Sequence, residues 1–356
     1  MTGGTGLAGN AVTGLVVTGW AALSAAGPDR RDLVAALRAG RPAGVAGVAG
    51  VAGDVPGGRG HVLDLDPRAR LGRKGTSALD RGTGLALIAA GDALADGGLD
   101  TADRVGVVIG TSLGGFRATM DYSLQTLTAD RPYLVSPARF PTAVMNGAAG
   151  QVAIRYGLRG VNATVAGGRL AFVESLRFAR NALRRGHADA LLVGAVEEFS
   201  AEQAWRTHRT GDPEVPAGEA AVVLAVRRAG SGAAPVAELL AAAVGFAPGD
   251  EQPAALGECA LRCLRQSTVD PGAVALLATG ELDPADRTEV AAVRSALGPA
   301  FAAERVLAGP VLGDCQAAAG GLAFAGLLAR TEGPGFGLQT GRTPAGAVGA
   351  ALWRIP

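Results

Sequence analysis

The chain has 356 residues, with 33 basic and 32 acidic side chains and a formal net charge of +1. No basic stripe points to nucleic acid, and no run of about 18 apolar residues points to a membrane span. Three cysteines are too few for a disulfide framework, so we expect a reduced, cytoplasmic protein. The Gly/Thr-rich start lacks the basic region and apolar run of a signal peptide.

The first part of the chain alternates apolar strand-like runs with amphipathic helices. Apolar spacing predicts, in chain order, a strand at Gly14–Trp20, helices at Asp32–Ala39 and Asp80–Ala95, a strand at Val105–Gly110, and helices at Phe116–Leu127 and Ala148–Gly157. Segment 40–60, rich in Gly, Ala and Val, is interpreted as an irregular loop. Thr111–Gly115 lacks the glycine spacing and the Lys-Ser/Thr end of a phosphate loop, so we interpret it as a turn.

A strand, a tight glycine turn and a helix follow one another in the stretch Asn162–Phe172. The helix is predicted from Leu170 to Arg185, with Arg169 at its start. An elbow of this kind presents a side chain at a helix N-terminus, where unpaired N–H groups favour an anion such as a thiolate. Arginine is neither a nucleophile at pH 7 nor stabilised by that end of the dipole.

The rest of the chain repeats the alternation. The pattern predicts strands at Ala190–Val196, Ala220–Val226, Val274–Leu277, Arg305–Leu307 and Gly349–Arg354, and helices at Ala254–Gln266, Asp286–Leu297 and Gln316–Ala329. Strands alternating with helices predict an α/β protein with largely parallel sheets. The segment 226–235 is the best candidate for a linker between two similar halves.

Several segments, in their order and spacing, resemble the thiolase-fold condensing enzymes, specifically the β-ketoacyl-ACP synthases. The segments include Val16–Trp20, Val107–Gly115, Ser136–Pro141, Ile154–Gly160, Gly186–Ala195 and Gly218–Ala221. The resemblance implies a thiolase-like α/β fold, with two similar βαβαβαββ halves in α-β-α-β-α layers. The halves would be residues 1–228 and a shortened 229–356.

The family's catalysis uses one Cys and two His, and the resemblance places other residues at all three positions. The nucleophile position is Arg169, the first His position is Ala278, and the second is Asp314. A family lysine shortly before the second His is replaced by Gly309. The family's glycine-rich gating loop has shrunk to 343–348, and the connection at 331–341 looks shortened. Condensation by this chain alone is not expected.

The chain thereby resembles the chain-length factor (KS-β) of a type II polyketide synthase, a catalytically silent ketosynthase paralogue. That resemblance implies an active ketosynthase subunit as heterodimer partner and an acyl carrier protein that carries the growing chain. It implies no cofactor, no metal, no nucleic acid and no membrane. Cys259 and Cys263 lie one helical turn apart, but no second Cys/His pair accompanies them, so core packing is favoured. Cys315 is interpreted as a structural thiol.

The resemblance also suggests roles for individual side chains. The elbow and the second His position face each other in the family, so we hypothesise an Arg169–Asp314 ion pair; the alternative is a solvated Arg169. On the helix after Gly115, Phe116, Thr119 and Ser123 share one face and are either core or a gate of the acyl tunnel, with Met120 adding to the same surface. The strand Asn162, Ala163, Thr164 and Val165 is the candidate for pairing across the dimer interface.

Two other functions stay open at this point. One is a divergent malonyl decarboxylase or acyl hydrolase, although in this fold decarboxylation needs an imidazole to stabilise the enolate. The other is a structural homodimer without a role in chain building.

Overall fold

The computed structural model describes residues 14–43, 54–100, 104–230 and 234–356. Its strands are β1 (Leu15–Ser24), β2 (Val105–Thr111), β3 (Asn162–Ala166), β4 (Ala190–Glu197), β5 (Ala220–Arg228), β6 (Ala237–Phe246), β7 (Val274–Thr279), β8 (Glu304–Leu307), β9 (Gly335–Arg342) and β10 (Ala347–Ile355). Its α-helices are α1 (Arg30–Ala39), α2 (Pro67–Leu71), α3 (Arg81–Asp96), α4 (Phe116–Thr128), α5 (Phe140–Ala143), α6 (Gly147–Tyr156), α7 (Ala171–Arg184), α8 (Ala201–Thr210), α9 (Gln252–Ser267), α10 (Thr288–Leu297), α11 (Gly309–Leu312) and α12 (Ala319–Arg330).

The order of the strands is symmetric about its middle. It runs β3-β2-β4-β5-β1-β6-β10-β9-β7-β8, so that β6 to β10 repeat the arrangement of β1 to β5 in reverse. In the first half, β2 is parallel to both of its neighbours and β5 is antiparallel to both of its own. In the second half, the same holds for β7 and β10. The halves join where three residues of β1, Leu15 to Val17, pair with the start of β6. This is the thiolase-like fold that the resemblance implied.

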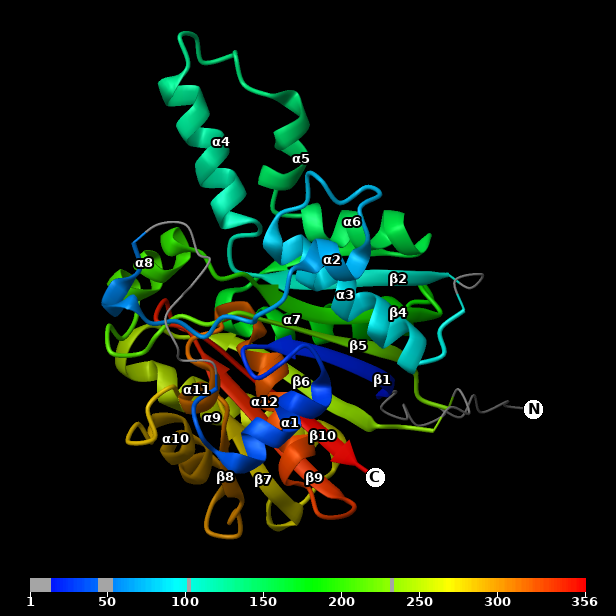
Figure 1. Ribbon diagram of the computed structural model, residues 1–356. Coiled ribbons are helices and arrows are strands. Elements are labelled where there is room, and N and C mark those ends of the chain that lie inside the picture. The colour runs from blue at the N-terminus through cyan, green and yellow to red at the C-terminus, as the bar shows by residue number, and fades with distance from the viewer. Residues whose placement is uncertain (1–13, 44–53, 101–103, 231–233) are drawn as a thin grey trace, which may run out of the picture.

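The helices and sheets form five layers: one apolar cluster surrounds the central helices, and two further clusters fill the two outer boundaries. Helices α7 and α12 lie between the two halves of the sheet, where α7 packs on β2, β4 and β6 and α12 on β7, β8 and β9. Helices α3 and α6 cover the outer face of the first half, and α9 with α10 covers that of the second. The α-β-α-β-α layering expected from the resemblance is therefore confirmed (Figure 1).

Small residues allow the central layer to pack closely. A Cβ atom on Gly320 of α12 would lie 2.8 Å from the Cβ of Phe172, and one on Gly321 would lie 2.6 Å from the Cβ of Val222. The ring of Phe324 fills the space beside them and lies 4.6 Å from the ring of Trp353. Because interiors pack at crystal-like density, these glycines set how near α12 comes to β5 and α7.

Three sequence expectations were wrong. The sheet is mixed, because four strand pairs are parallel and five are antiparallel. Strands β6 and β9 were not predicted, since β6 is alanine-rich and β9 carries three glycines, and both residues have low strand propensity. Helix α8 was not predicted either, because seven of its ten residues are polar, and its last turn falls in a segment, Thr207–Gly218, that the sequence indicated as a polar, Pro-containing connection. Burial in the sheet overrides propensity for β6 and β9.

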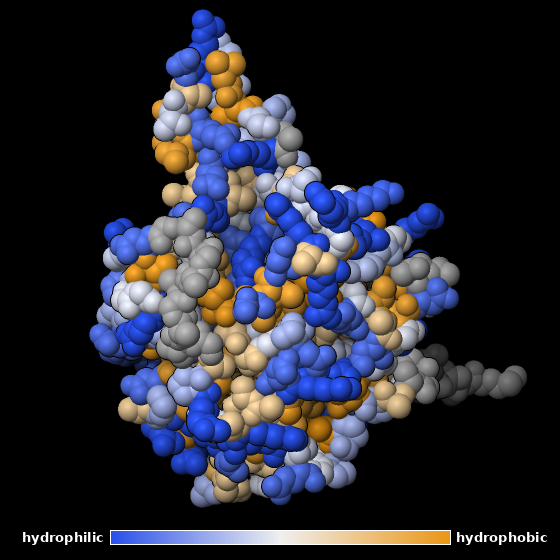
Figure 2. Space-filling model, in the orientation of Figure 1, coloured by the Kyte–Doolittle hydropathy of each residue, from blue (hydrophilic) through white to orange (hydrophobic). Residues whose placement is uncertain are grey.

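One part of the molecule stands away from the body. Helices α4 and α5 with their connection, residues 116–143, form a projecting arm (Figure 1). No residue of α4 is buried. Of the ten large apolar side chains that are exposed in the described residues, six lie on this arm: Met120, Leu124, Leu127, Tyr133, Leu134 and Phe140. Apolar groups along the arm are also visible on its surface in Figure 2.

Within the described residues, no helix combines the length and apolar character needed to cross a membrane. The same residues hold no group of three or more His, Cys, Asp or Glu that could bind a metal ion.

Candidate functional site

The elbow predicted from the sequence is present at the N-terminus of α7. Strand β3 ends at Ala166, and a single 3-10 turn at Gly168–Leu170 leads into the helix. Gly168 has φ 54°, in the left-handed region that favours glycine. A Cβ on Gly167 would lie 2.0 Å from the Oε2 atom of Glu174. The two glycines therefore make a turn that places Arg169 at the start of α7.

The side chain of Arg169 reaches Asp314. Its Nη2 atom lies 2.5 Å from Oδ2 of Asp314, a residue 145 positions further along the chain. The Arg169 side chain is 18% exposed and that of Asp314 is 1% exposed. The structure thus brings together Arg169 and Asp314, the two residues of the ion pair hypothesised from the sequence.

A second residue completes the binding of the Asp314 carboxylate. The backbone N–H of Gln316 donates to Oδ1 at 3.0 Å, and the Gln316 side-chain amide donates to Oδ2 at 2.6 Å. Gln316 adopts φ 42°, which is uncommon for a residue with a side chain. With Arg169, three donors surround a carboxylate that is shielded from water, which is the condition for holding a buried charge.

Ala278, the position that the resemblance assigned to the first His, lies on β7. Its side chain is fully buried, and it pairs with Gln339 of β9 across the strands. The amide of Gln339 donates to the Gly320 carbonyl at 2.8 Å and accepts from the indole N–H of Trp353 at 3.2 Å. Gln339 and Arg169 line the same pocket, together with Leu170, Val173, Gly280, Ala319, Gly320, Thr340, Gly341 and Arg342. Ala278 is not one of the residues that line this pocket, so the structure does not bring it together with Arg169 there.

Two acidic residues at the end of β4 were not singled out from the sequence. The Glu197 carboxylate accepts from the Ala317 N–H at 3.2 Å and from the Gln203 amide at 3.2 Å. Burial raises the pKa of Glu197 to about 7, and the neighbouring charge of Asp314 adds to that effect. Two consecutive acids directly after an apolar strand are a signal that sequence reading could have used.

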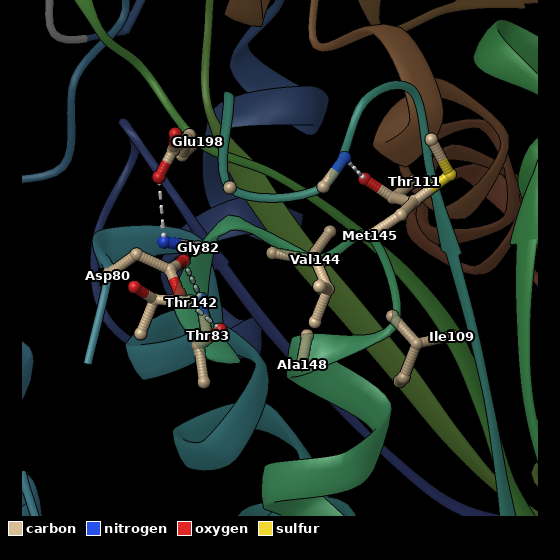
Figure 3. Close-up of a pocket in the computed structure, with 13 residues that line it drawn as sticks. Asp80, Gly82, Thr83, Ile109, Thr111, Thr142, Val144, Met145, Ala148 and Glu198 are labelled. Atoms are coloured by element: carbon tan, nitrogen blue, oxygen red, sulfur yellow. Dashed lines mark hydrogen bonds between the residues drawn. The ribbon is translucent and has the colours of Figure 1, made fainter. Parts of the chain in front are cut away.

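Glu198 ties the projecting arm to the body of the molecule. Its carboxylate accepts from the Gly82 N–H at 3.1 Å and from the Arg117 N–H at 3.1 Å, at the first turns of α3 and α4. Burial, followed by the charge of Asp80, raises the pKa of Glu198 to about 8. Figure 3 shows Glu198 beside Gly82 and Asp80 at one side of a pocket at the base of the arm; the pocket is lined further by Ile109, Thr111, Val144, Met145 and others.

The four gate candidates all lie on α4. Phe116 and Thr119 are half-buried, whereas Met120 and Ser123 are exposed. The Thr119 hydroxyl donates to the Gly115 carbonyl and to the Ala143 carbonyl, both at 3.0 Å. These side chains therefore line the arm, and none of them belongs to the core of this chain.

The candidate dimer strand is β3, at the edge of the sheet. Asn162 to Ala166 pair in parallel with Val107 to Thr111 of β2, and β3 has no strand on its other side in the described part of the chain. Asn162 is exposed, whereas Ala163, Thr164 and Val165 are half-buried. Its free edge is one along which another chain could add a strand.

The three cysteines are free and buried. Burial raises the pKa of Cys263 to about 12 and that of Cys315 well above its ordinary value. Of the histidines, His61 is buried, and its Nδ1 lies 2.6 Å from the Ala43 carbonyl oxygen. Burial lowers the pKa of His61. It packs behind Gly313, where a Cβ would lie 2.5 Å from its ring, and neither Arg169 nor Asp314 hydrogen-bonds to it in the described structure.

Comparison with known proteins shows to which family this chain belongs. The model of the β-ketoacyl synthase N-terminal domain matches residues 13–214. A 3-oxoacyl-[acyl-carrier-protein] synthase 2 from Staphylococcus aureus is 30% identical over 275 residues, which cover 68% of this chain and 68% of that relative. A 3-oxoacyl-[acyl-carrier-protein] synthase 2 from Coxiella burnetii is 29% identical over 191 residues, 52% of this chain and 46% of that relative.

Solved structures agree with that match. The ishigamide ketosynthase/chain length factor superposes with a TM-score of 0.87 at 35% identity, over 96% of this chain and 99% of that one. A β-ketoacyl synthase from Burkholderia phymatum shares the fold, with a TM-score of 0.82 at 17% identity over 97% and 100% of the two chains. A type II polyketide synthase acyl-carrier protein in complex with its ketosynthase also shares it, with a TM-score of 0.77 at 16% identity over 97% and 100%. The chain belongs to the β-ketoacyl synthase family.

Proposed function

We propose that this protein is the catalytically silent chain-length-factor subunit of a heterodimeric ketosynthase in type II polyketide biosynthesis. It would stabilise an active ketosynthase subunit and shape the tunnel that receives the chain carried by an acyl carrier protein. The observation that carries the proposal is the Arg169–Asp314 ion pair, which occupies the place where the resemblance puts a nucleophilic Cys and an assisting His.

The residues at this site cannot perform the family's chemistry. A guanidinium stays protonated at neutral pH and cannot attack a thioester. A carboxylate offers no hydrogen-bond donor to a developing oxyanion, and that of Asp314 already accepts from Arg169 and Gln316. Ala278 offers no imidazole, and in the described structure His61 hydrogen-bonds to a backbone carbonyl away from the pair. These residues support a role in shape and assembly.

Two features of the molecular surface support the proposal that this chain binds a partner subunit. The arm presents six exposed apolar side chains, and Leu127 among them is 82% exposed. Exposed apolar groups concentrated on one feature indicate a protein interface. The free edge of β3 offers backbone groups to a second chain. The similar ishigamide protein is a ketosynthase/chain length factor, which is consistent with a ketosynthase as the occupant of this surface. The free thiols suit a reduced, cytoplasmic setting.

The division of the chain at residue 228 is part of the same proposal. Strand β5 ends at Arg228 and β6 begins at Ala237, so the two five-stranded halves are joined by the segment that the sequence suggested as a linker. Residues 229–356 make up the shorter of the two halves.

Reconstitution tests the proposal. The chain is combined with a ketosynthase paralogue that has an intact Cys/His/His set, and is supplied with radiolabelled acyl-carrier and malonyl-carrier proteins. We expect elongation by the pair, no elongation by this chain alone, and label bound covalently to the ketosynthase only. Replacing the ketosynthase cysteine by Ala should abolish elongation. Label attached covalently to this chain would refute catalytic silence.

The same assay separates the rival functions. Malonyl-carrier protein incubated with the isolated chain should release no carbon dioxide. Turnover that is lost in Asp314→Ala would instead favour a divergent decarboxylase. Failure of every matched ketosynthase to associate with the chain would favour a structural homodimer.

A further inference from the structure

A cluster of arginines on α7 and α9 has no acidic partner among the residues that the structure describes. Helix α7 carries Arg177, Arg180 and Arg184, of which the first and third are exposed and Arg180 is half-buried. Arg262 of α9 is half-buried, and its Nη2 donates to the Val244 carbonyl at 2.8 Å and to Cys259 Sγ at 3.2 Å. We call these four residues the arginine cluster.

The charges of the arginine cluster are uncompensated. The Nε atoms of Arg180 and Arg262 are buried and have no hydrogen-bond partner. Among the ion pairs of the described residues, none joins any of the four to a carboxylate. Burial lowers the pKa of Arg180, and repulsion from Arg184 and Arg177 adds to the effect. A buried donor without an acceptor is costly, so a position of this kind calls for an explanation.

The nearest acidic side chains do not supply the missing partner. Glu174, one turn before Arg177 on α7, points toward Gly167 at the other end of the helix. Glu258 lies one turn before Arg262 on α9 and is exposed; it acts electrostatically on Cys259, yet it forms no ion pair with the cluster in the described structure. Within residues 14–43, 54–100, 104–230 and 234–356, no carboxylate is therefore paired with these guanidinium groups.

The arginine cluster adjoins the surface that the proposed function assigns to the partner. Helix α7 packs between β2, β3 and β4 on one side and β6 on the other. Strand β3 is an edge strand, and α7 packs against it, so the helix that carries three of the four arginines lies beside the free edge of the sheet. Phe178 of α7 and Phe246 at the end of β6 are 40% and 68% exposed. Apolar groups beside unpaired guanidinium groups are typical of an interface that has lost its partner.

Resting on the proposed function, we propose that the arginine cluster receives carboxylates of the ketosynthase subunit and at the same time discriminates against self-pairing. Two identical chains related by a two-fold axis present the same patch to each other. Pairing of two copies through β3 would bring their α7 helices, and with them two like-charged clusters, toward that axis. Repulsion there disfavours a homodimer, whereas a partner with acidic groups at the matching place is favoured.

Two double variants and one control test this inference. Arg177→Gln/Arg180→Gln removes the charges, and Arg177→Glu/Arg180→Glu reverses them. Arg294→Glu changes an exposed arginine of α10, in the outer layer of the second half. Self-association is measured by sedimentation equilibrium, and affinity for the ketosynthase by biolayer interferometry at low salt. Thermal unfolding shows whether each variant is folded.

We expect the neutral double variant to self-associate at least about 10-fold more tightly than the wild type, because repulsion is removed. The reversed double variant should bind the ketosynthase at least about 30-fold more weakly, and Arg294→Glu should match the wild type. A folded reversed variant that binds the ketosynthase within about twofold of wild type overturns the inference. If the wild-type chain does not bind the ketosynthase, the proposed function fails. The self-association measurement still tests this inference, because a neutral double variant that self-associates no more tightly than the wild type would overturn it.

Discussion

The guanidinium of Arg169 and the carboxylate of Asp314 form a largely buried ion pair between the start of α7 and the loop that follows α11. The pair joins the two halves of the molecule, since one partner belongs to the first half and the other to the second.

Breaking this pair should be costly. In Arg169→Gln the Asp314 carboxylate stays buried and keeps only Gln316 as donor, so we expect a loss of about 3 kcal/mol in the free energy of unfolding. Asp314→Asn should cost less, because Arg169 can reach water. Urea denaturation of both single variants and the double variant should give a coupling of about 1–3 kcal/mol. The exposed pair Arg104–Asp189 is a matched control, for which we expect no resolvable coupling. Additive effects at Arg169 and Asp314 would contradict the prediction.

Phe116 should limit the length of the product. It is half-buried at the base of the arm, on the face of α4 that carries Thr119. Replacing it by Ala removes a ring from the proposed tunnel, so Phe116→Ala in the reconstituted complex should shift the products to longer chains, seen by mass spectrometry. Thr128→Ala, at the far end of the same helix, should leave the distribution unchanged. An unchanged length in Phe116→Ala would remove this residue from the gate.

The arm should be needed for assembly and dispensable for folding. Leu124→Ser/Leu127→Ser/Leu134→Ser removes three exposed leucines, so the unfolding temperature of the isolated chain should stay within about 2 °C of wild type, since exposed sites contribute little to stability. Affinity for the ketosynthase should fall at least about 100-fold, because clustered apolar groups dominate binding energies. Undiminished affinity would place the interface elsewhere.

Stability should fall as the pH rises through neutrality. The folded-state pKa of Glu198 is about 8, above the ordinary value of 4.5, so the folded protein binds more protons than the unfolded chain between these values. The contribution of this group to the free energy of unfolding is therefore largest below about pH 4.5. It decreases as the pH rises to about 8, by at most about 1.4 kcal/mol per pH unit. Glu197, with a pKa of about 7, contributes in the same direction. Glu198→Gln mimics the protonated acid, and its unfolding temperature should vary less than wild type between pH 6 and pH 8. If the unfolding temperatures of the wild type and Glu198→Gln change with pH in parallel, the prediction is contradicted.

The pattern of apolar residues in the sequence was sufficient to predict the helices and strands whose periodicity is strong. Helix α7 and the elbow before it follow from an apolar stripe and two glycines, and the structure places the helix at Ala171–Arg184. Strand β9 was not predicted because three of the eight residues in its sequence, Gly-Phe-Gly-Leu-Gln-Thr-Gly-Arg, are glycines with low strand propensity; its pairing with β7 and β10 makes it a strand. Short polar segments of this kind are determined by tertiary pairing.

The candidate site could be located only with the help of the family resemblance. Arg169 and Asp314 lie 145 residues apart, and nothing local to either residue indicates that they meet. The part played by Gln316 depends on a left-handed backbone conformation that its sequence does not predict. Glu198 was visible as an acid after an apolar strand, but its contacts with Gly82 and Arg117 arise from the packing of three separate elements.

The three-residue junction between β1 and β6 carries a consequence for how the chain can be divided. Helices α7 and α12 each pack against strands of both halves. Cutting the polypeptide between Arg228 and Ala237 would therefore expose, in each fragment, apolar surface of the central helix that the other half covers. Neither fragment would then be expected to fold by itself, and the molecule should unfold as one cooperative body despite its internal repetition.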